Sequence, residues 1–178
     1  MTMRLIVVTG GVRSGKSTWA QTRAEAIGGD AVSVVATAEA IDEEMGRRIS
    51  AHQAERPDAW ETIEAPAGVG AAIRSAHHAT VVLDCLTVLS GTAMARGNVG
   101  SEADALAVVE AEVDGILDAC SRREGTLIVV TNEVGWSVHP ATALGRWFQD
   151  ALGAANRRLA ASADEVILMV AGLEMRLR

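Results

Sequence analysis

The sequence predicts an α/β fold in which a mostly parallel β-sheet carries helices on both faces, forming three layers. Short runs of valine, isoleucine and leucine alternate along the chain with longer segments of helical periodicity. A glycine-rich segment separates the first apolar run from the first helical segment. This order of strand, glycine loop and helix predicts a sandwich of the P-loop NTPase type.

Five or six mostly parallel strands follow from the alternation. With 178 residues and no internal repeat or low-complexity linker, the chain 1–178 is expected to form a single nucleotide-binding domain. After residue 171 we expect only a short basic tail containing Arg176 and Arg178. The expected strands are 4–9, 31–36, 59–65, 80–84, 126–131 and 165–171. The expected helices are 17–27, 42–55, 71–76, 88–95, 101–120 and 141–162.

Residues 10–17, GGVRSGKS, match the phosphate-binding pattern G-x-x-x-x-G-K-[ST] at every position. Glycines let the backbone wrap a phosphate with its N–H groups, and the following helix directs its positive end at the anion. Lys16 supplies a compact charge, and the Ser17 hydroxyl is a ligand for Mg²⁺. Lys16 is the only lysine beside 15 arginines, which favours a specific role over a chance match. The segment therefore predicts a bound nucleoside triphosphate.

The overall composition excludes several other functions. The 16 basic and 23 acidic residues give a net charge of −7, which argues against a nucleic-acid partner. No apolar run has the length of a membrane span, and the start of the chain has no signal-peptide layout, so we expect a cytoplasmic protein. Cys85 and Cys120 form no C-x-x-C pair, which predicts two reduced thiols, with Cys85 a small buried side chain.

Polar residues follow several of the expected strands. Asp84 ends the run TVVLD, where a carboxylate holds Mg²⁺ in phosphate-loop enzymes. Thr37 and Glu39 follow the second strand, and residues 132–136, NEVGW, follow the strand 126–131. Because ligands bind at the carboxyl ends of parallel strands, we expect these groups near the nucleotide.

His52 lies on the apolar stripe of the helix expected over 42–55. Its spacing from Ile41, Met45 and Ile49 directs it toward the domain or toward a cleft. Spacing alone favours a histidine without special chemistry. His77 and His78 precede a turn and are expected to be solvated loop histidines.

Taken together, the motifs resemble the bifunctional adenosylcobinamide kinase / adenosylcobinamide-phosphate guanylyltransferase family of cobalamin biosynthesis. The resemblance covers nearly the whole chain and is carried by GGVRSGKS, ATAEAIDEEMGRRISAHQAERP, VVLDCLT, VTNEVGWSVHP and ALGAANRRLAASADEVILMVAG. It implies phosphorylation of adenosylcobinamide with ATP or GTP. It also implies transfer of GMP from GTP to adenosylcobinamide phosphate, through a guanylylated histidine that matches His52.

The resemblance also implies a set of site residues and a homotrimer. Lys16 and His52 would be catalytic, and Ser17 and Asp84 would hold Mg²⁺, while Trp136 and Trp147 are candidate anchors of a subunit interface. The implied nucleotide contacts are Gly10, Gly11, Val12, Arg13, Ser14, Gly15, Lys16, Ser17, Thr37, Ala38, Glu39, Gln53, Ala54, Glu55, Arg56, Glu64 and Asp84.

Departures from the family pattern leave some points open. Ala51 precedes His52 where some relatives carry a second histidine, and residues 137–142 differ from the family's usual loop. The G-protein guanine motif N-K-x-D is absent, so the preference for guanine rests on the resemblance. A phosphate-loop kinase without guanylyltransferase activity and a nucleotide-binding regulatory protein without turnover are the alternatives. The kinase donor and the residues that bind the corrinoid are not specified by the sequence.

Overall fold

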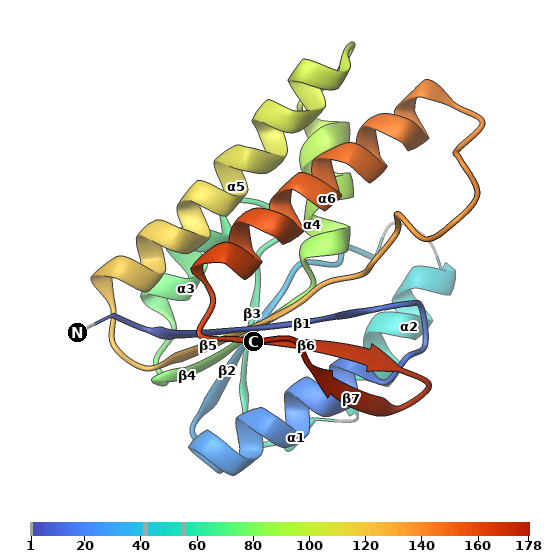
Figure 1. Ribbon diagram of the computed structural model, residues 1–178. Coiled ribbons are helices and arrows are strands. Elements are labelled where there is room, and N and C mark those ends of the chain that lie inside the picture. Colours follow the sequence, from blue (N-terminus) through green and yellow to red (C-terminus); the bar gives the residue numbers. More distant parts are fainter. Residues whose placement is uncertain (1, 41–42, 55) are drawn as a thin grey trace.

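The computed structural model describes residues 2–40, 43–54 and 56–178, without the side chains of residues 44, 45, 48, 49, 51 and 52. Within this part of the chain, the strands form one seven-stranded sheet in the order β3-β2-β4-β5-β1-β6-β7 (Figure 1). The strands are β1 (Arg4–Gly10), β2 (Val32–Ala36), β3 (Glu61–Glu64), β4 (Thr80–Asp84), β5 (Thr126–Val130), β6 (Glu165–Val170) and β7 (Leu173–Arg176). The helices are α1 (Lys16–Gly28), α2 (Glu43–Ala54), α3 (Val69–Ser75), α4 (Leu86–Arg96), α5 (Glu102–Arg122) and α6 (Ala143–Ser162).

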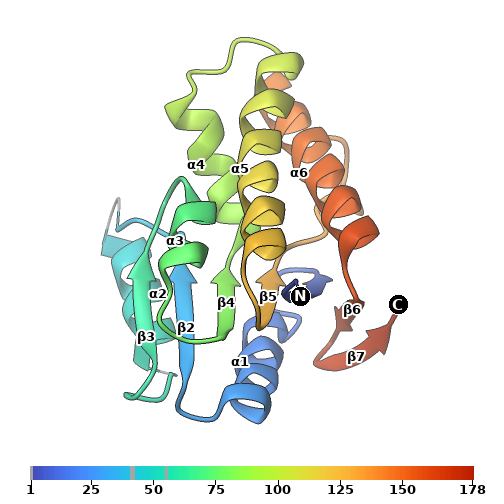
Figure 2. The ribbon, with the colours of Figure 1, turned by 90° about the vertical axis from the view of Figure 1, so that its left-hand side faces the viewer.

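The predicted three-layer α/β fold is confirmed. Strands β1 to β6 pair in parallel, and Figure 2 shows β3, β2, β4 and β5 side by side in that order. Side chains alternate across β1: Ile6 packs in the core between the sheet and α1, and Val7 packs in the core between the sheet and helices α3 to α6. Burying each such side chain stabilises the fold by about 1.5–3 kcal/mol. The two cores therefore cover both faces of the sheet.

The prediction of a tail after residue 171 is wrong. Residues 173–176 form β7, which pairs antiparallel with β6 through a tight turn at Ala171 and Gly172. All four residues of β7 are exposed, so the strand buries no apolar face that a sequence pattern would reveal. The sheet therefore gains an antiparallel edge strand.

The register of the parallel strands brings their carboxyl ends together. Ala36 of β2 pairs with Asp84 of β4, which in turn pairs with Val130 of β5. The residues that follow β2, β4 and β5 therefore lie together at the carboxyl edge of the sheet, where the parallel strands end, beside the loop that follows β1.

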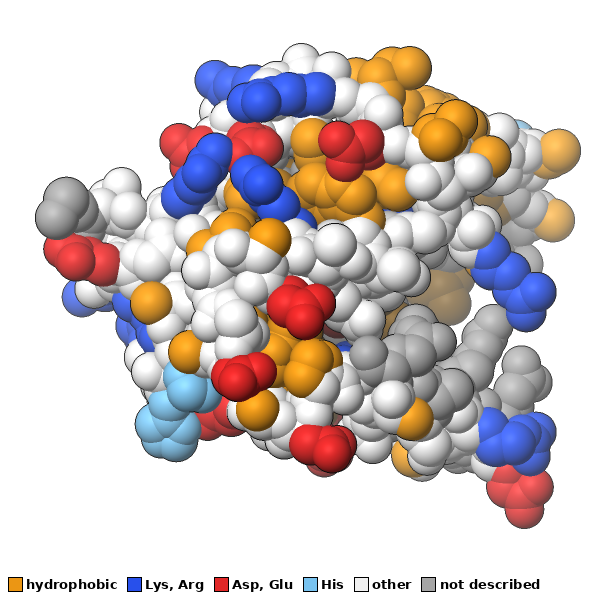
Figure 3. Space-filling model, turned by 90° about the horizontal axis from the view of Figure 1, so that it is seen from below, with side chains coloured by type: hydrophobic (Ala, Val, Ile, Leu, Met, Phe, Trp, Pro, Cys, Tyr) orange, Lys and Arg blue, Asp and Glu red, His pale blue; other side chains and the backbone are white. Residues whose placement is uncertain are grey.

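The described helices include none that is long and apolar enough to cross a membrane. Acidic and basic side chains are interspersed with hydrophobic ones on the face seen from below (Figure 3). On this face the described basic side chains do not form a continuous field.

Candidate active site

The loop after β1 turns into α1 through backbone conformations that favour glycine. Gly10 has φ +147, and a Cβ there would lie 2.3 Å from the Met169 carbonyl oxygen of β6. Gly15, immediately before α1, has φ +96. The helix begins at Lys16, close to the predicted start at Ser17. The first N–H groups of α1 are therefore available to an anion in the loop.

Lys16 is buried, with 7% of its surface exposed, and its Nζ donates to the Gly11 carbonyl oxygen at 2.6 Å. Burial lowers the pKa of Lys16, while the nearby Cys85 and Asp84 raise it. A phosphate group in the loop would add negative charge beside the ammonium and favour its charged form. The geometry therefore suits a lysine that binds an anion.

The C-terminal hairpin of β6 and β7 braces the phosphate loop. The Gly172 N–H in its turn donates to the Ser14 carbonyl oxygen at 3.0 Å. Trp19 of α1 donates through its indole nitrogen to the Glu174 carboxylate of β7. The edge strand β7 and the turn before it thus hold the phosphate loop and α1 in place, and the sequence did not predict this strand.

A cleft of about 630 Å³ opens over the phosphate loop. Eleven of the predicted contact residues line it: Val12, Arg13, Ser14, Gly15, Lys16, Ser17, Ala38, Gln53, Arg56, Glu64 and Asp84. Five further lining residues were not among the predicted contacts: Thr18, Ala36, Cys85, Val88 and Asn132. Glu55 lies outside the described residues.

Asp84 and Arg56 form the charged wall of the cleft. Arg56 Nη2 lies 3.9 Å from Asp84 Oδ2, with side chains 8% and 16% exposed. Arg56 follows α2 and Asp84 ends β4, so the pair joins two segments 28 positions apart in the sequence. A largely buried carboxylate beside an arginine can hold either a cation or, through the arginine, a phosphate.

The other predicted nucleotide contacts have local roles in this structure. The Thr37 hydroxyl is buried and donates to the Cys85 carbonyl oxygen at 2.8 Å, while accepting from the Cys85 N–H at 2.9 Å. Thr37 therefore fixes the backbone after Asp84. Glu39 is paired with Arg96 of α4 at 2.8 Å. Neither residue lines the cleft, nor do Gly10, Gly11 and Ala54, so their contact with a nucleotide stays a prediction.

The segment after β5 supplies Asn132 to the cleft, and α6 holds that segment in place. Asn156 of α6 donates to the Asn132 carbonyl oxygen at 2.9 Å and accepts from the Thr131 hydroxyl at 2.7 Å. The Asn132 N–H donates to the Thr87 hydroxyl at 2.9 Å. A polar residue after a buried strand was the available signal for Asn132.

Cys85 is partly buried, packs against the core and also lines the cleft, so it is not the fully buried side chain that was predicted. It stands at the end of β4, where the chain opens toward the ligand. Burial, followed by the charge of Asp84, raises the pKa of the Cys85 thiol to about 11. The thiol is therefore protonated at neutral pH and is a poor nucleophile.

The oxygen ligands needed for Mg²⁺ are present in the cleft. Ser17 and Asp84 line it together, and hydroxyl and carboxylate oxygens are the ligands that this hard cation prefers. Among the described residues there is no cluster of three or more His, Cys, Asp or Glu residues that could hold a metal. Mg²⁺ is usually held by one or two protein carboxylates together with substrate phosphates and water.

The backbone of α2 confirms the predicted helix that carries His52. The side chain of His52 lies outside the described residues, so its predicted role as nucleophile stays a prediction. Gln53, in the last turn of α2, and Arg56, which follows the helix, both line the cleft.

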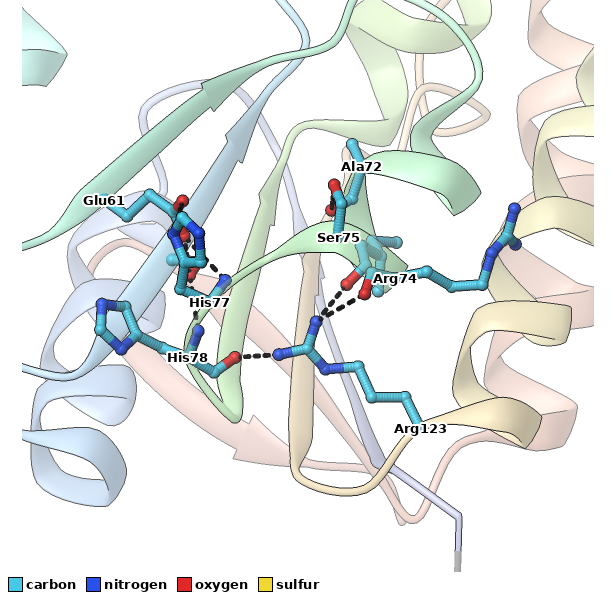
Figure 4. Close-up of polar contacts among 9 residues, drawn as sticks. Glu61, Ala72, Arg74, Ser75, His77, His78 and Arg123 are labelled. Atoms are coloured by element: carbon cyan, nitrogen blue, oxygen red, sulfur yellow. Dashed lines mark hydrogen bonds and ion pairs between the residues drawn. The ribbon is translucent and has the colours of Figure 1, made fainter.

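A polar cluster lies at the opposite, amino edge of the sheet (Figure 4). His77 is 81% exposed, as predicted for a loop histidine, yet its Nδ1 lies 2.5 Å from the Glu61 carboxylate. The His78 N–H donates to the Ser33 hydroxyl at 3.2 Å. Arg123 donates to the carbonyl oxygens of Ile73, Arg74 and His78. These contacts fasten the loop before β4, so both histidines belong to a structural connection.

Comparisons with known proteins show the fold and the family of the chain. A solved type III secretion ATPase aligns with a TM-score of 0.59 and 12% identity over 98% of this chain and 58% of that one, which shows a shared fold. The bifunctional adenosylcobalamin biosynthesis protein CobU of Salmonella typhimurium is 36% identical over 98% of this chain and 99% of its own length. CobP of Pseudomonas aeruginosa, named in the same way, is 37% identical over 97% and 96%. The family model for cobinamide kinase / cobinamide phosphate guanyltransferase matches residues 6–177, and the chain belongs to this family.

Proposed function

We propose that this protein phosphorylates the aminopropanol hydroxyl of adenosylcobinamide and then transfers GMP from GTP to adenosylcobinamide phosphate, releasing pyrophosphate. The observation that carries the proposal is the phosphate cleft, in which Lys16, Asp84 and Arg56 converge. It supports a triphosphate-using enzyme, and membership of the family supports these two reactions. ATP or GTP serves as the phosphate donor in the first reaction.

In both reactions Lys16 and the N–H groups of the loop hold the triphosphate. Ser17 and Asp84 would bind Mg²⁺, which neutralises the charge that develops on the phosphates. Arg56 adds a second positive group to the same wall and lies within 3.9 Å of Asp84. Gln53, Ala38 and Glu64 border the remaining space, where the nucleoside would lie.

His52 carries GMP in the second reaction. One imidazole nitrogen forms a bond to the α-phosphorus of GTP, and the bond from that phosphorus to the β-phosphate oxygen breaks, so pyrophosphate leaves. An oxygen of adenosylcobinamide phosphate then forms a bond to the same phosphorus, and the nitrogen–phosphorus bond breaks. A neutral imidazole is available for this attack near pH 7.

Labelling with α-labelled GTP and Mg²⁺ tests this step. Wild-type protein should acquire label that is acid-labile and base-stable, and His52→Ala should acquire none. His77→Ala is the matched control, because His77 lies at the opposite edge of the sheet and should keep the label. His52→Ala should retain phosphorylation of adenosylcobinamide.

The outcomes separate the candidate functions. Kinase activity without covalent label in the wild type would favour the alternative of a kinase that lacks the transferase step. If adenosylcobinamide with ATP or GTP yields neither a phosphorylated nor a guanylylated corrinoid, both enzymatic functions fail.

A homotrimer is part of the proposal. Trp136 is 72% exposed and remains a candidate interface anchor, whereas Trp147 packs against the core of its own chain. Sedimentation equilibrium of the wild type tests the assembly: a mass near three chains is expected, and a monomer would contradict it.

A further inference from the structure

A second cleft, of about 550 Å³, lies between α6 and the loop that follows β5. Its walls are predominantly polar. The loop contributes Ser137 and His139, and α6 contributes Gln149, Asp150, Gly153 and Arg157. Asp150, Gly153 and Arg157 are spaced by three and four positions, so they share one side of the helix. This cleft thus offers several hydrogen-bond donors and acceptors along one side.

The loop that forms the other wall is fastened at both ends. Near its start, Gln149 of α6 donates to the Val134 carbonyl oxygen at 3.0 Å. Near its end, Arg146 donates to the Pro140 carbonyl oxygen at 3.1 Å. Between these points Trp136 and Val138 are 72% and 91% exposed. These two apolar side chains are therefore available to an apolar surface of a ligand.

Residues of one short segment after β5 line both the second cleft and the nucleotide cleft. Asn132 lines the nucleotide cleft, and Gly135, three residues later, lines the second one. Three residues of extended chain span at most about 11 Å, so the two clefts lie close enough for an arm of a ligand in the second cleft to reach toward the phosphate loop. The cobinamide acceptor has this layout: a macrocycle with apolar faces and an edge of amide side chains, and one arm ending in the hydroxyl to be phosphorylated.

We propose that the second cleft binds the corrin macrocycle of the acceptor. Arg157, Gln149 and Asp150 contact its amide side chains, while Val138 covers part of an apolar face. The terminal arm then reaches the nucleotide cleft past Asn132. This assignment rests on the proposed function, because it takes the acceptor from the proposed reactions.

Filling the cleft is the main test. A Cβ at Gly153 would meet nothing within 4 Å, and Gly153 lines the second cleft, so a side chain there begins without a backbone clash and extends into the cleft. Gly153→Phe should raise the KM for adenosylcobinamide at least about tenfold, and Gly153→Ala should raise it less. Arg157→Ala removes a charged donor and should raise that KM about tenfold. The KM for the nucleotide and the covalent labelling by GTP alone should not change, because neither needs the acceptor.

Arg158→Ala is the matched control. Arg158 is the next residue of α6 but pairs with Asp114 of α5, so its replacement should leave the KM for the acceptor unchanged. Direct binding is measured by equilibrium dialysis of cobinamide alone, whose corrin ring absorbs visible light. Gly153→Phe and Arg157→Ala should weaken this binding by the same factors.

The outcomes separate this proposal from the proposed function. If the wild type is active and the Gly153→Phe and Arg157→Ala variants bind cobinamide normally, the second cleft is not the corrin site, and the proposed function stays intact. If these variants show a lower sedimentation mass and unchanged cobinamide binding, the second cleft forms contacts between copies of the chain. This result would also overturn its assignment as the corrin site. Cobinamide binding that is lost in Gly153→Phe, in a protein without turnover, would support the cleft and contradict the proposed function.

Discussion

The two edges of the parallel sheet use polar residues in different ways. At the amino edge, Ser33, Glu61 and Arg123 bind groups of the same chain, and the contacts join the starts of β2, β3, β4 and β5. At the carboxyl edge, Lys16 and Asp84 border a cleft of about 630 Å³. Polar and charged side chains therefore stabilise the fold at one edge and border the cleft at the other. Substitutions at the two edges should separate stability from activity.

Lys16→Ala should have the largest effect on activity. Removing the charge that holds the transferring or leaving phosphates should lower both activities at least about 10²-fold. Burial lowers the pKa of Lys16, so removing the ammonium relieves a desolvation cost that offsets its lost hydrogen bond to the Gly11 carbonyl oxygen, and the thermal unfolding midpoint should change little. Steady-state kinetics and thermal unfolding measure the two effects.

Lys16→Arg is the matched control for the position of the charge. It keeps the charge, but a planar guanidinium is larger than the ammonium, and Lys16 is 7% exposed, so activity should stay low. Full nucleotide affinity in Lys16→Ala would contradict the role of the loop lysine.

Arg123→Ala should show the reverse separation, with a large effect on stability. Its guanidinium binds three carbonyl oxygens, and losing them should lower the free energy of unfolding by about 2 kcal/mol. Arg122→Ala is the control, because the exposed Arg122–Asp118 pair contributes less than about 1 kcal/mol.

Urea unfolding measures these stability changes, and kinetics below the unfolding transition should give a normal KM for the nucleotide in both variants. An altered nucleotide KM in Arg123→Ala would show that the two edges are coupled.

The sequence predicted the features of this comparison that depend on local patterns. Alternating apolar runs predicted β1 to β6, and the glycine motif predicted the position of Lys16. The hairpin strand β7 was missed because its residues are all exposed. In addition, Ala171 of its turn has a positive φ, and alanine is not a residue type that predicts a turn of this kind.

Contacts between distant segments could not be predicted from local patterns. Arg56 and Asp84 are 28 positions apart and meet only in the folded chain. Arg123 is one of 15 arginines, and the sequence around it does not indicate that it binds three carbonyl oxygens. Thr37 was expected near the nucleotide because it follows a strand, but its hydroxyl fixes the backbone at Cys85. Position after a strand indicates the correct edge of the sheet without indicating which way a side chain points.

The smallest effect is expected for the pH dependence of the amino edge. A hydrogen bond from Ser33 and contacts with His77 lower the pKa of Glu61 below its usual 4.5. A depressed carboxyl pKa contributes stability that is present above the unfolded-state value and is lost as the pH falls through the folded-state value. Between about pH 6 and about pH 3, the wild type should therefore lose more stability than Glu61→Gln. Urea unfolding across this range measures the difference, and parallel curves for the two proteins would exclude Glu61 as a source of acid sensitivity. His77→Ala should change stability at pH 7 by less than about 1 kcal/mol, because the histidine is 81% exposed.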